Sequence, residues 1–119
     1  MITTGFAREF AEEWIASWNA QDLDRVLSYY SDDFEMTSPI IVHLKGETDG
    51  RLKGREAVAE YLQRALHVLQ GLHLKLETIL TGVDSVTLYY TGPRGYSAEV
   101  FHFDENRKIV RTFSHFDVG

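Results

Sequence analysis

The C-terminal part of the chain contains four strand-like segments joined by short connectors, and this arrangement constrains the fold more than any other feature. The segments, rich in β-branched and aromatic residues, cover about Leu72–Leu80, Val86–Thr91, Tyr96–Phe103 and Lys108–Phe116. The connectors, Gly82–Ser85, Gly92–Gly95 and Asp104–Arg107, have the length and the turn residues of hairpin loops. Because hairpin loops join antiparallel neighbours, the sequence predicts an antiparallel meander.

The N-terminal part is predicted to be helical from its periodicity. From Gly5 to Asn19, large apolar residues recur at every fourth position and acidic residues occupy the other side, which indicates an amphipathic helix. Asp22 is expected to cap a second, shorter helix, whose apolar stripe contains Leu23, Val26, Leu27 and Tyr30. A third helix is predicted from about Arg55 to Leu69, and Gly71 suits its C-terminal stop. Its apolar stripe is expected to be buried and contains Val58, Tyr61, Leu62, Ala65, Leu66 and Leu69.

Shorter segments connect these helices and strands. Ser31–Asp33 is expected to form a turn, and its two aspartates are interpreted as turn formers. Phe34–Ser38 is predicted to be a short strand that ends at Pro39, and Ile40–Leu44 to be either a strand or a pocket-lining loop. Lys45–Lys53 is charged and rich in glycine, which predicts a loop, either a flexible lid at a pocket mouth or a solvated segment.

Composition narrows the class of protein. A chain of 119 residues with 44% hydrophobic residues and no linker or repeat is expected to form one domain over residues 1–119. The absence of cysteine excludes disulfides and cysteine-based metal or redox chemistry. A net charge of −6 argues against nucleic-acid and membrane partners. With neither a signal-like N-terminus nor a membrane-length apolar window, a cytoplasmic location is expected.

The last predicted hairpin presents two different faces. A four-residue loop would pair Phe103 with Lys108 and Glu99 with Thr112, and side chains alternate between the faces of a sheet. One face then carries Ser97, Glu99, Phe101, Phe103, Val110, Thr112, Ser114 and Phe116. The other carries Tyr96, Ala98, Val100, His102, Ile109, Arg111, Phe113 and His115.

The two faces predict two different uses. The first mixes aromatic rings and hydroxyls with a single carboxylate, which is the composition of a ligand cavity. The second is mostly apolar, which favours a homodimer through the outer sheet face, although a moderately exposed surface is the alternative. Glu99 is the leading candidate for a catalytic residue, because burial among aromatic rings would raise its pKa toward neutrality. The alternative is that Glu99 is a solvated or ion-paired strand residue.

The chain has three predicted helices followed by a curved meander, and the stretch from Tyr29 to Pro39 lies between the second helix and the first strand. This order resembles the nuclear transport factor 2-like superfamily, and within it the branch of SnoaL-like and ketosteroid-isomerase-like proteins. The stretches that carry the resemblance are Trp14–Asn19 with Asp22–Asp24, Tyr30–Phe34, Ser38–Pro39, Leu52–Glu56 and Val100–Glu105. It covers nearly the whole chain. It implies an α+β fold in which a cone-shaped, curved antiparallel β-sheet wraps around helices (a cystatin-like or nuclear transport factor 2-like α+β barrel), with a deep pocket and, usually, a dimer.

The isomerase branch implies a catalytic set that this chain keeps only in part. That branch uses a carboxylate base before the proline of the first strand, a first-helix tyrosine and a protonated acid on the penultimate strand. By motif position these map to Ser38, Trp14 and Glu99. Serine cannot shuttle a proton as a base at neutral pH, and tryptophan offers one indole N–H. Only Glu99 keeps the acid, so the resemblance implies a pocket without the full isomerase set.

The remaining site candidates concern the pocket wall, metals and cofactors. The residues expected to line the pocket are Trp14, Trp18, Tyr30, Phe34, Ser38, Tyr61, Phe101, Thr112, Ser114 and Phe116, and the tryptophans and tyrosines among them also fit a plain core. His43, His67, His73, His102 and His115 lack metal-site spacing, so no metal is expected. His115 and Asp117 share a strand face and could form a proton-transfer pair or a structural one. No nucleotide-binding motif occurs, so no cofactor is expected.

Three functions fit these observations. The first is a cofactor-independent isomerase, cyclase or lyase that acts on a small apolar substrate in the pocket, with Glu99 as acid or base. The second is a non-catalytic module that binds or senses a hydrophobic ligand. The third is a dimeric scaffold for a protein partner.

Overall fold

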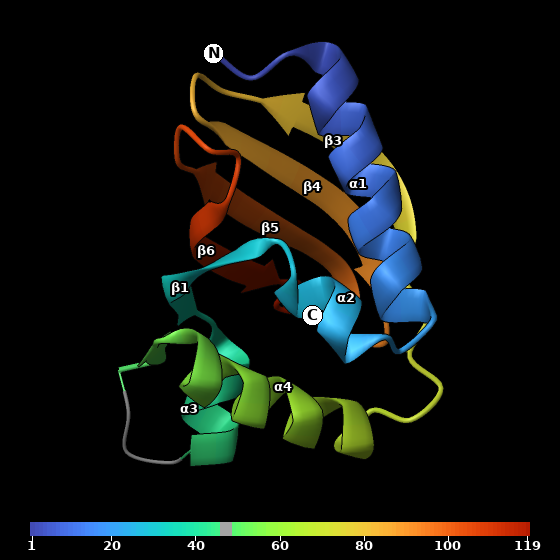
Figure 1. Cartoon of the computed structure of the whole chain (residues 1–119). Helices are drawn as coiled ribbons and strands as arrows, with labels where there is room; N and C mark the ends of the chain where they lie inside the picture. The colour runs from blue at the N-terminus through green and yellow to red at the C-terminus, as the bar shows by residue number, and fades with distance from the viewer. Residues whose placement is uncertain (46–48) are drawn as a thin grey trace.

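The structure is a computed structural model that describes residues 1–45 and 49–119. The elements follow one another as α1 (Thr4–Asn19), α2 (Leu23–Leu27), β1 (Tyr30–Thr37), α3 (Pro39–Lys45), β2 (Arg51–Lys53), α4 (Arg55–Val68), β3 (Lys75–Thr81), β4 (Ser85–Gly92), β5 (Gly95–Phe103) and β6 (Ile109–Phe116) (Figure 1). None of the described helices is long and apolar enough to cross a membrane.

The strands of the described residues form one sheet of six strands, with the order β2-β1-β6-β5-β4-β3. The predicted antiparallel meander is confirmed, because β3, β4, β5 and β6 pair with their neighbours in chain order. The pairing of β1 with β6 is parallel, which the meander did not predict. The sheet curves without closing, and the helices pack against it, with α1 along β3 and α4 against β1 (Figure 1). The predicted α+β class is therefore confirmed.

Three linking segments differ from the predictions. Ile40–Leu44 lies in helix α3, because Ser38 accepts the N–H of Ile40 at 3.2 Å and Pro39 suits the first helical position. Ser31–Asp33 is part of β1 and does not form a turn. The C-terminal end of the expected loop Lys45–Lys53 forms strand β2, which pairs with β1. The lid interpretation depends on residues 46–48, which lie outside the described residues.

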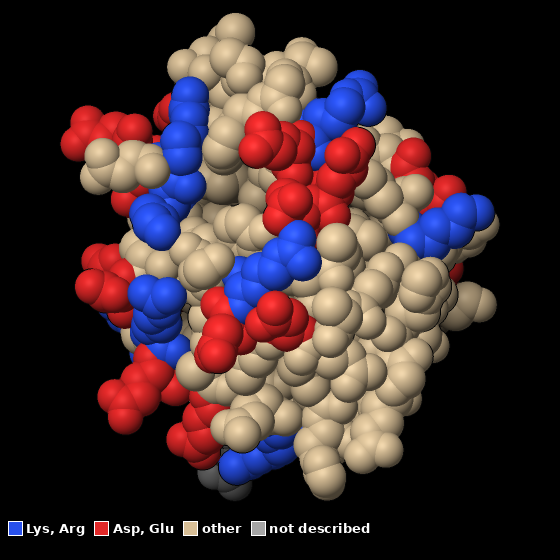
Figure 2. Space-filling model, turned by 45° about the vertical axis from the view of Figure 1, so that its right-hand side comes forward, with Lys and Arg blue, Asp and Glu red and all other residues tan. Residues whose placement is uncertain are grey.

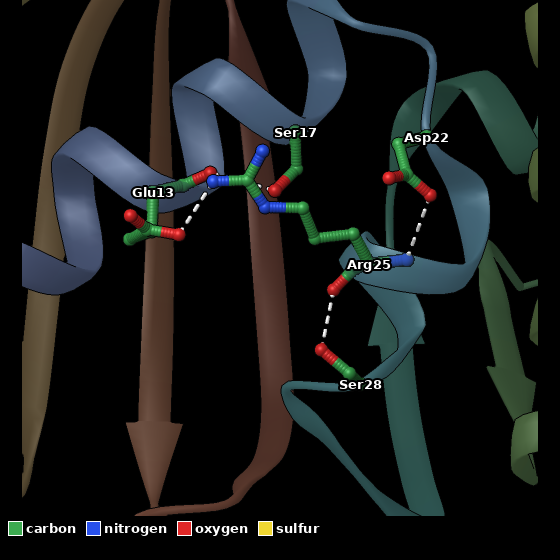
Figure 3. A network of polar contacts seen from close by, with 5 residues as sticks. All are labelled: Glu13, Ser17, Asp22, Arg25 and Ser28. Carbon is green, nitrogen blue, oxygen red and sulfur yellow. Dashed lines mark hydrogen bonds and ion pairs between the residues drawn. The ribbon is translucent and has the colours of Figure 1, made fainter.

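A polar corner sets the angle between α1 and α2 (Figure 3). Arg25 forms an ion pair with Glu13, and the Asp22 carboxylate accepts the backbone N–H of Arg25 at 3.2 Å, as the predicted N-cap requires. The Ser17 hydroxyl donates to the Glu13 carbonyl at 2.7 Å. Because this ion pair is exposed to solvent, it contributes little to stability, so the corner links the two helices and most of their stability comes from apolar packing.

Aromatic edge-to-face contacts attach α1 to the sheet. The Phe10 ring lies edge-on to Phe101 and Phe103, with centroid distances of 4.9 and 5.1 Å. The Trp14 ring lies edge-on to Phe101 at 5.0 Å. Contacts of this geometry add about 0.5–1.5 kcal/mol each beyond the burial of their surface. They hold the middle of α1 over β5, and the Trp14 ring also lies edge-on to Tyr90 of β4 at 5.8 Å.

The register of the last hairpin differs from the prediction by two one-residue shifts in the same direction, and a total shift of two residues restores the predicted faces beyond the bulge. Asp104 pairs with Lys108 through a 2.8 Å hydrogen bond, so the loop is one residue longer than expected and Phe103 faces Ile109. A bulge after His102 then shifts the register once more, so that Glu99 faces Ser114 and not Thr112. The faces of β5 are therefore as predicted, but Ile109 is fully buried on the inner face in place of Val110.

This register predicts unequal costs for two neighbouring truncations. Ile109→Ala removes a fully buried side chain and should lower the free energy of unfolding by about 2–5 kcal/mol. Val110→Ala, at the half-buried bulge position, should cost less than about 1 kcal/mol. Urea unfolding of both variants checks this, and the reverse order of costs would contradict the observed register.

Candidate active site

A cavity of about 110 Å³ lies between α1, α4 and the concave face of the sheet. Its wall is mostly apolar, and the residues that line it are Trp14, Trp18, Tyr30, Met36, Ser38, Ile40, Tyr61, Leu62, Ala65, Leu66, Leu69, Leu72, Leu74, Tyr90, Gly92, Pro93, Arg94, Ser97, Glu99, Ser114 and Phe116. This volume can hold a few waters or a small organic molecule, and it is below the usual size of sites for drug-sized ligands.

The residues predicted to line the pocket fall into two layers. Those that line the cavity are Trp14, Trp18, Tyr30, Ser38, Tyr61, Glu99, Ser114 and Phe116. The other three, Phe34, Phe101 and Thr112, are fully buried behind the wall. Phe34 stacks on the Tyr30 ring at 4.1 Å, and Phe101 supports Trp14. The outer layer therefore holds the rings that face the cavity in place.

Glu99 is the acid of this cavity. It lies on β5 with 4% of its surface exposed. Burial raises the pKa of its carboxyl to about 7, although the Ser114 and Thr112 hydroxyls partly oppose this by favouring the charged form. No lysine, arginine or histidine in the described part of the chain forms an ion pair with it. Near neutral pH, both the acid and the carboxylate are therefore present.

Three tyrosines from three different elements line the same cavity as this carboxyl. Tyr30 lies on β1, Tyr61 on α4 and Tyr90 on β4, and all three line the cavity. Burial is the main cause that raises the pKa of each phenol, to about 12 for Tyr61, and the charge of Glu99 raises all three further. These hydroxyls therefore stay protonated at any physiological pH and serve as hydrogen-bonding groups.

Unpartnered hydrogen-bond donors also meet at the cavity. The indole N–H groups of Trp14 and Trp18 and the Tyr30 hydroxyl are buried without a hydrogen-bond partner among the described residues. Trp14 lies close enough to lower the pKa of Tyr30 slightly, although no hydrogen bond of ordinary length joins the two. Buried donors are rarely left without a partner. Their common position on the wall points to an oxygen atom of a ligand or of water.

Several lining residues were not predicted. Tyr90 follows Val86 and Leu88 on the inner face of β4, a period-two pattern that could have placed it beside Glu99. Ser97 was assigned to the inner face without being named as a site residue. Arg94 lies in the β4–β5 turn, where no sequence periodicity indicates a direction. The C-terminal half of α4 contributes Leu62, Ala65 and Leu66, which were predicted as core.

The histidines lie away from this cavity. His43, His67, His73 and His115 are exposed, and no hydrogen bond joins His115 to Asp117 in the described structure. His102 lies on the outer sheet face, where burial and the charge of Arg111 lower its pKa. Among the described residues, no group of three histidines or acids could hold a metal ion.

Comparison with known proteins gives one family and many similar folds. The SnoaL-like domain family matches residues 11–112. A SnoaL-like protein of unknown function from Burkholderia thailandensis is 46% identical, with 98% of this chain and 99% of that chain covered and a TM-score of 0.92. These matches confirm the predicted resemblance. No curated protein matches significantly.

Two more distant solved structures share the fold alone. A nuclear transport factor 2-like protein from Cytophaga hutchinsonii is 15% identical, with 98% of this chain and 92% of that chain covered and a TM-score of 0.70. An epoxide hydrolase/cyclase-like enzyme of pyran ring formation in the polyether salinomycin is 16% identical, with 99% and 95% covered and a TM-score of 0.75.

The buried acid predicts a specific pH dependence of stability. Since the pKa of Glu99 is about 7 in the folded protein and 4.5 for an ordinary solvated glutamate, folding favours the protonated form, and this group's contribution to stability falls as the pH rises from about 4.5 to 7. Glu99→Gln removes that loss. Between pH 5 and pH 8, the free energy of unfolding of the variant should rise by about 2 kcal/mol relative to that of the wild type, which urea unfolding measures.

Glu77→Gln is the matched control, because Glu77 is exposed on β3. Its stability should follow the wild type at every pH. A constant difference between Glu99→Gln and the wild type across this range would show that the carboxyl is not desolvated.

Proposed function

This chain belongs to the SnoaL-like domain family, and we propose that it is a cofactor-independent enzyme that moves a proton on a small apolar molecule, with Glu99 as acid and base. The observation that carries the proposal is the carboxyl of Glu99 itself. It lies in a mostly apolar cavity and forms no ion pair among the described residues, and its pKa of about 7 suits proton transfer at neutral pH.

The surrounding donors suit a substrate with a carbonyl oxygen. The indole N–H of Trp14 and the hydroxyl of Tyr30 are free to donate hydrogen bonds to that oxygen. The Glu99 carboxylate takes a proton from the carbon beside the carbonyl, and the electron pair moves onto the oxygen to give an enolate. If a carbon–carbon double bond is conjugated with the enolate, the same carboxyl can return its proton to a different carbon, and the shift of the double bond isomerises the substrate. Fixed donors in a mostly apolar cavity stabilise the enolate more strongly than water does.

A second function, a non-catalytic module that binds a hydrophobic ligand, is favoured by the leucine-rich wall. Leu62, Leu66 and Leu69 supply apolar contact area that does not involve Glu99 at all. Binding then requires only the cavity, and Glu99 would be a polar anchor.

Hydrogen exchange separates the two functions. The protein should speed deuterium incorporation at the carbons beside the carbonyl of a small cyclic ketone such as cyclohexanone, followed by NMR in heavy water. The rate should rise as the pH passes about 7, since the carboxylate is the base. Glu99→Gln should lower the rate at least about 100-fold and leave ketone affinity nearly unchanged, while Glu77→Gln keeps the wild-type rate.

Two outcomes would count against catalysis by Glu99. Deuterium exchange by the Glu99→Gln variant at the wild-type rate would show that Glu99 takes no part in the proton transfer. Saturable ketone binding without any exchange would favour the binding module.

We also propose that the chain forms a homodimer through the outer sheet face, defined here as Tyr89, Tyr96, Ala98, Val100, His102, Phe113 and His115. Tyr89 and Tyr96 stack at 5.6 Å while 38% and 53% of their surfaces remain exposed. His102 lies edge-on to Phe113 at 5.8 Å. Partly exposed aromatic side chains that lie together on one face are typical of the centre of a protein interface.

A charge at the centre of this face should separate the subunits. Val100 lies between Thr87 and Phe113 in the sheet, and Val100→Glu would bury a carboxylate in the dimer but expose it in the monomer. We expect the wild type to sediment with the mass of two chains and the variant with the mass of one. Gln63→Glu, on the exposed side of α4, is the control. A monomeric wild type would contradict the proposal.

A further inference from the structure

Arg94 stands at the mouth of the cavity. It lies in the tight turn between β4 and β5, where Gly92 pairs with Gly95, and its side chain lines the cavity. The guanidinium lies over the Phe116 ring at 5.3 Å from the ring centroid. Because Phe116 also lines the cavity, this contact holds the positive charge beside the opening.

The guanidinium has no acidic partner. Arg25, Arg55 and Arg64 each form an ion pair with a carboxylate, whereas no hydrogen bond or ion pair of Arg94 occurs among the described residues. The charge of Arg94 nevertheless acts on the cavity, because it partly opposes the rise that burial causes in the pKa of Tyr61. The five N–H donors of the guanidinium are therefore available to a ligand.

The surroundings of Arg94 are mostly uncharged, although the carboxylate of Asp117 lies next to Gly95 without forming an ion pair with Arg94 in the described structure. An outer depression of about 430 Å³ adjoins the cavity and shares Leu69, Leu72, Gly92 and Pro93 with it. Residues 65–74, which form the end of α4 and the following loop, contain no acidic residue, lysine or arginine. Figure 2 shows mixed acidic and basic side chains over one part of the surface and a broad uncharged area at the lower right.

Among the described residues that line the cavity and this depression, Glu99 is the only acid, and Arg94 is the only lysine or arginine. Arg94 lies at the mouth, and Glu99 is deeply buried. An anion placed deep in the cavity would be repelled by the Glu99 carboxylate and would lose its water. An anion at the mouth would meet the guanidinium, which can grip a carboxylate through two parallel hydrogen bonds.

We propose that the cavity selects molecules that carry one carboxylate on a compact apolar body, with Arg94 binding the carboxylate at the mouth and the apolar body lying between α4 and the sheet. This inference deepens the proposed function, since it names the substrate class for the same cavity. It makes Arg94 a specificity-determining residue and leaves the proton transfer to Glu99.

A matched pair of probes tests this inference. Phenylacetate and phenylacetamide have almost the same shape, but only phenylacetate is charged. Isothermal titration calorimetry at neutral pH should show about tenfold tighter binding of phenylacetate to the wild type, because a charge-assisted hydrogen bond is worth more than a neutral one. Added salt should weaken this preference.

Substitutions of Arg94 test whether this residue causes the preference for phenylacetate. Arg94→Gln should bind both probes equally, and Arg94→Lys should keep part of the preference through its charge. Arg111→Gln is the matched control, because Arg111 is an exposed arginine on the outer face of β6. It should behave as the wild type.

The outcomes separate this inference from the proposed proton transfer. Equal binding of both probes to the wild type, or a preference that Arg94→Gln retains, overturns the inference and leaves the ketone exchange untouched. Binding of neither probe overturns it as well. A preference for phenylacetate that persists in Glu99→Gln supports it even if no proton transfer is ever observed.

Discussion

Desolvation of a single carboxyl is the constraint on which the proposed site depends. Glu99 lies on a strand whose inner face packs toward helices, so its carboxyl is removed from water together with the aromatic residues around it. Nearby hydroxyls favour the charged form only weakly, and no counter-charge is paired with it in the described structure. A group in this position destabilises the folded protein at high pH, and a raised pKa is the physical consequence.

A second layer of aromatic rings lies behind the wall of the cavity that holds this carboxyl. Trp14 packs against Phe101 and Tyr30 against Phe34, and these contacts help to set the orientation of the rings that face the cavity. The corner of Glu13 and Arg25 orients α2 against α1 without filling the interior (Figure 3). The site thus combines the buried acid Glu99 with hydrogen-bond donors that lack a partner among the described residues and, at the mouth, with the charge of Arg94, which forms no ion pair there.

The sequence predicted most of the fold because alternation and turn residues are local signals. The inward position of Glu99 followed from alternation along β5 and is independent of the hairpin register, which was wrong by a longer loop and a bulge. Helix α3 was missed because a short apolar run does not distinguish helix from strand, although Ser38-Pro39 is a helix-start signal. Arg94 could not be predicted, since the direction of a turn residue depends on the elements packed around it.

The pKa of Glu99 is the quantity that tests this account most directly. The side-chain carboxyl carbon can be followed by NMR across the pH range in protein labelled with carbon-13 at glutamate, with Glu99→Gln to assign the signal. The account predicts a midpoint of about 7. A midpoint near the ordinary glutamate value of 4.5 would mean that the carboxyl is solvated, and the proposed acid–base chemistry would lose its basis.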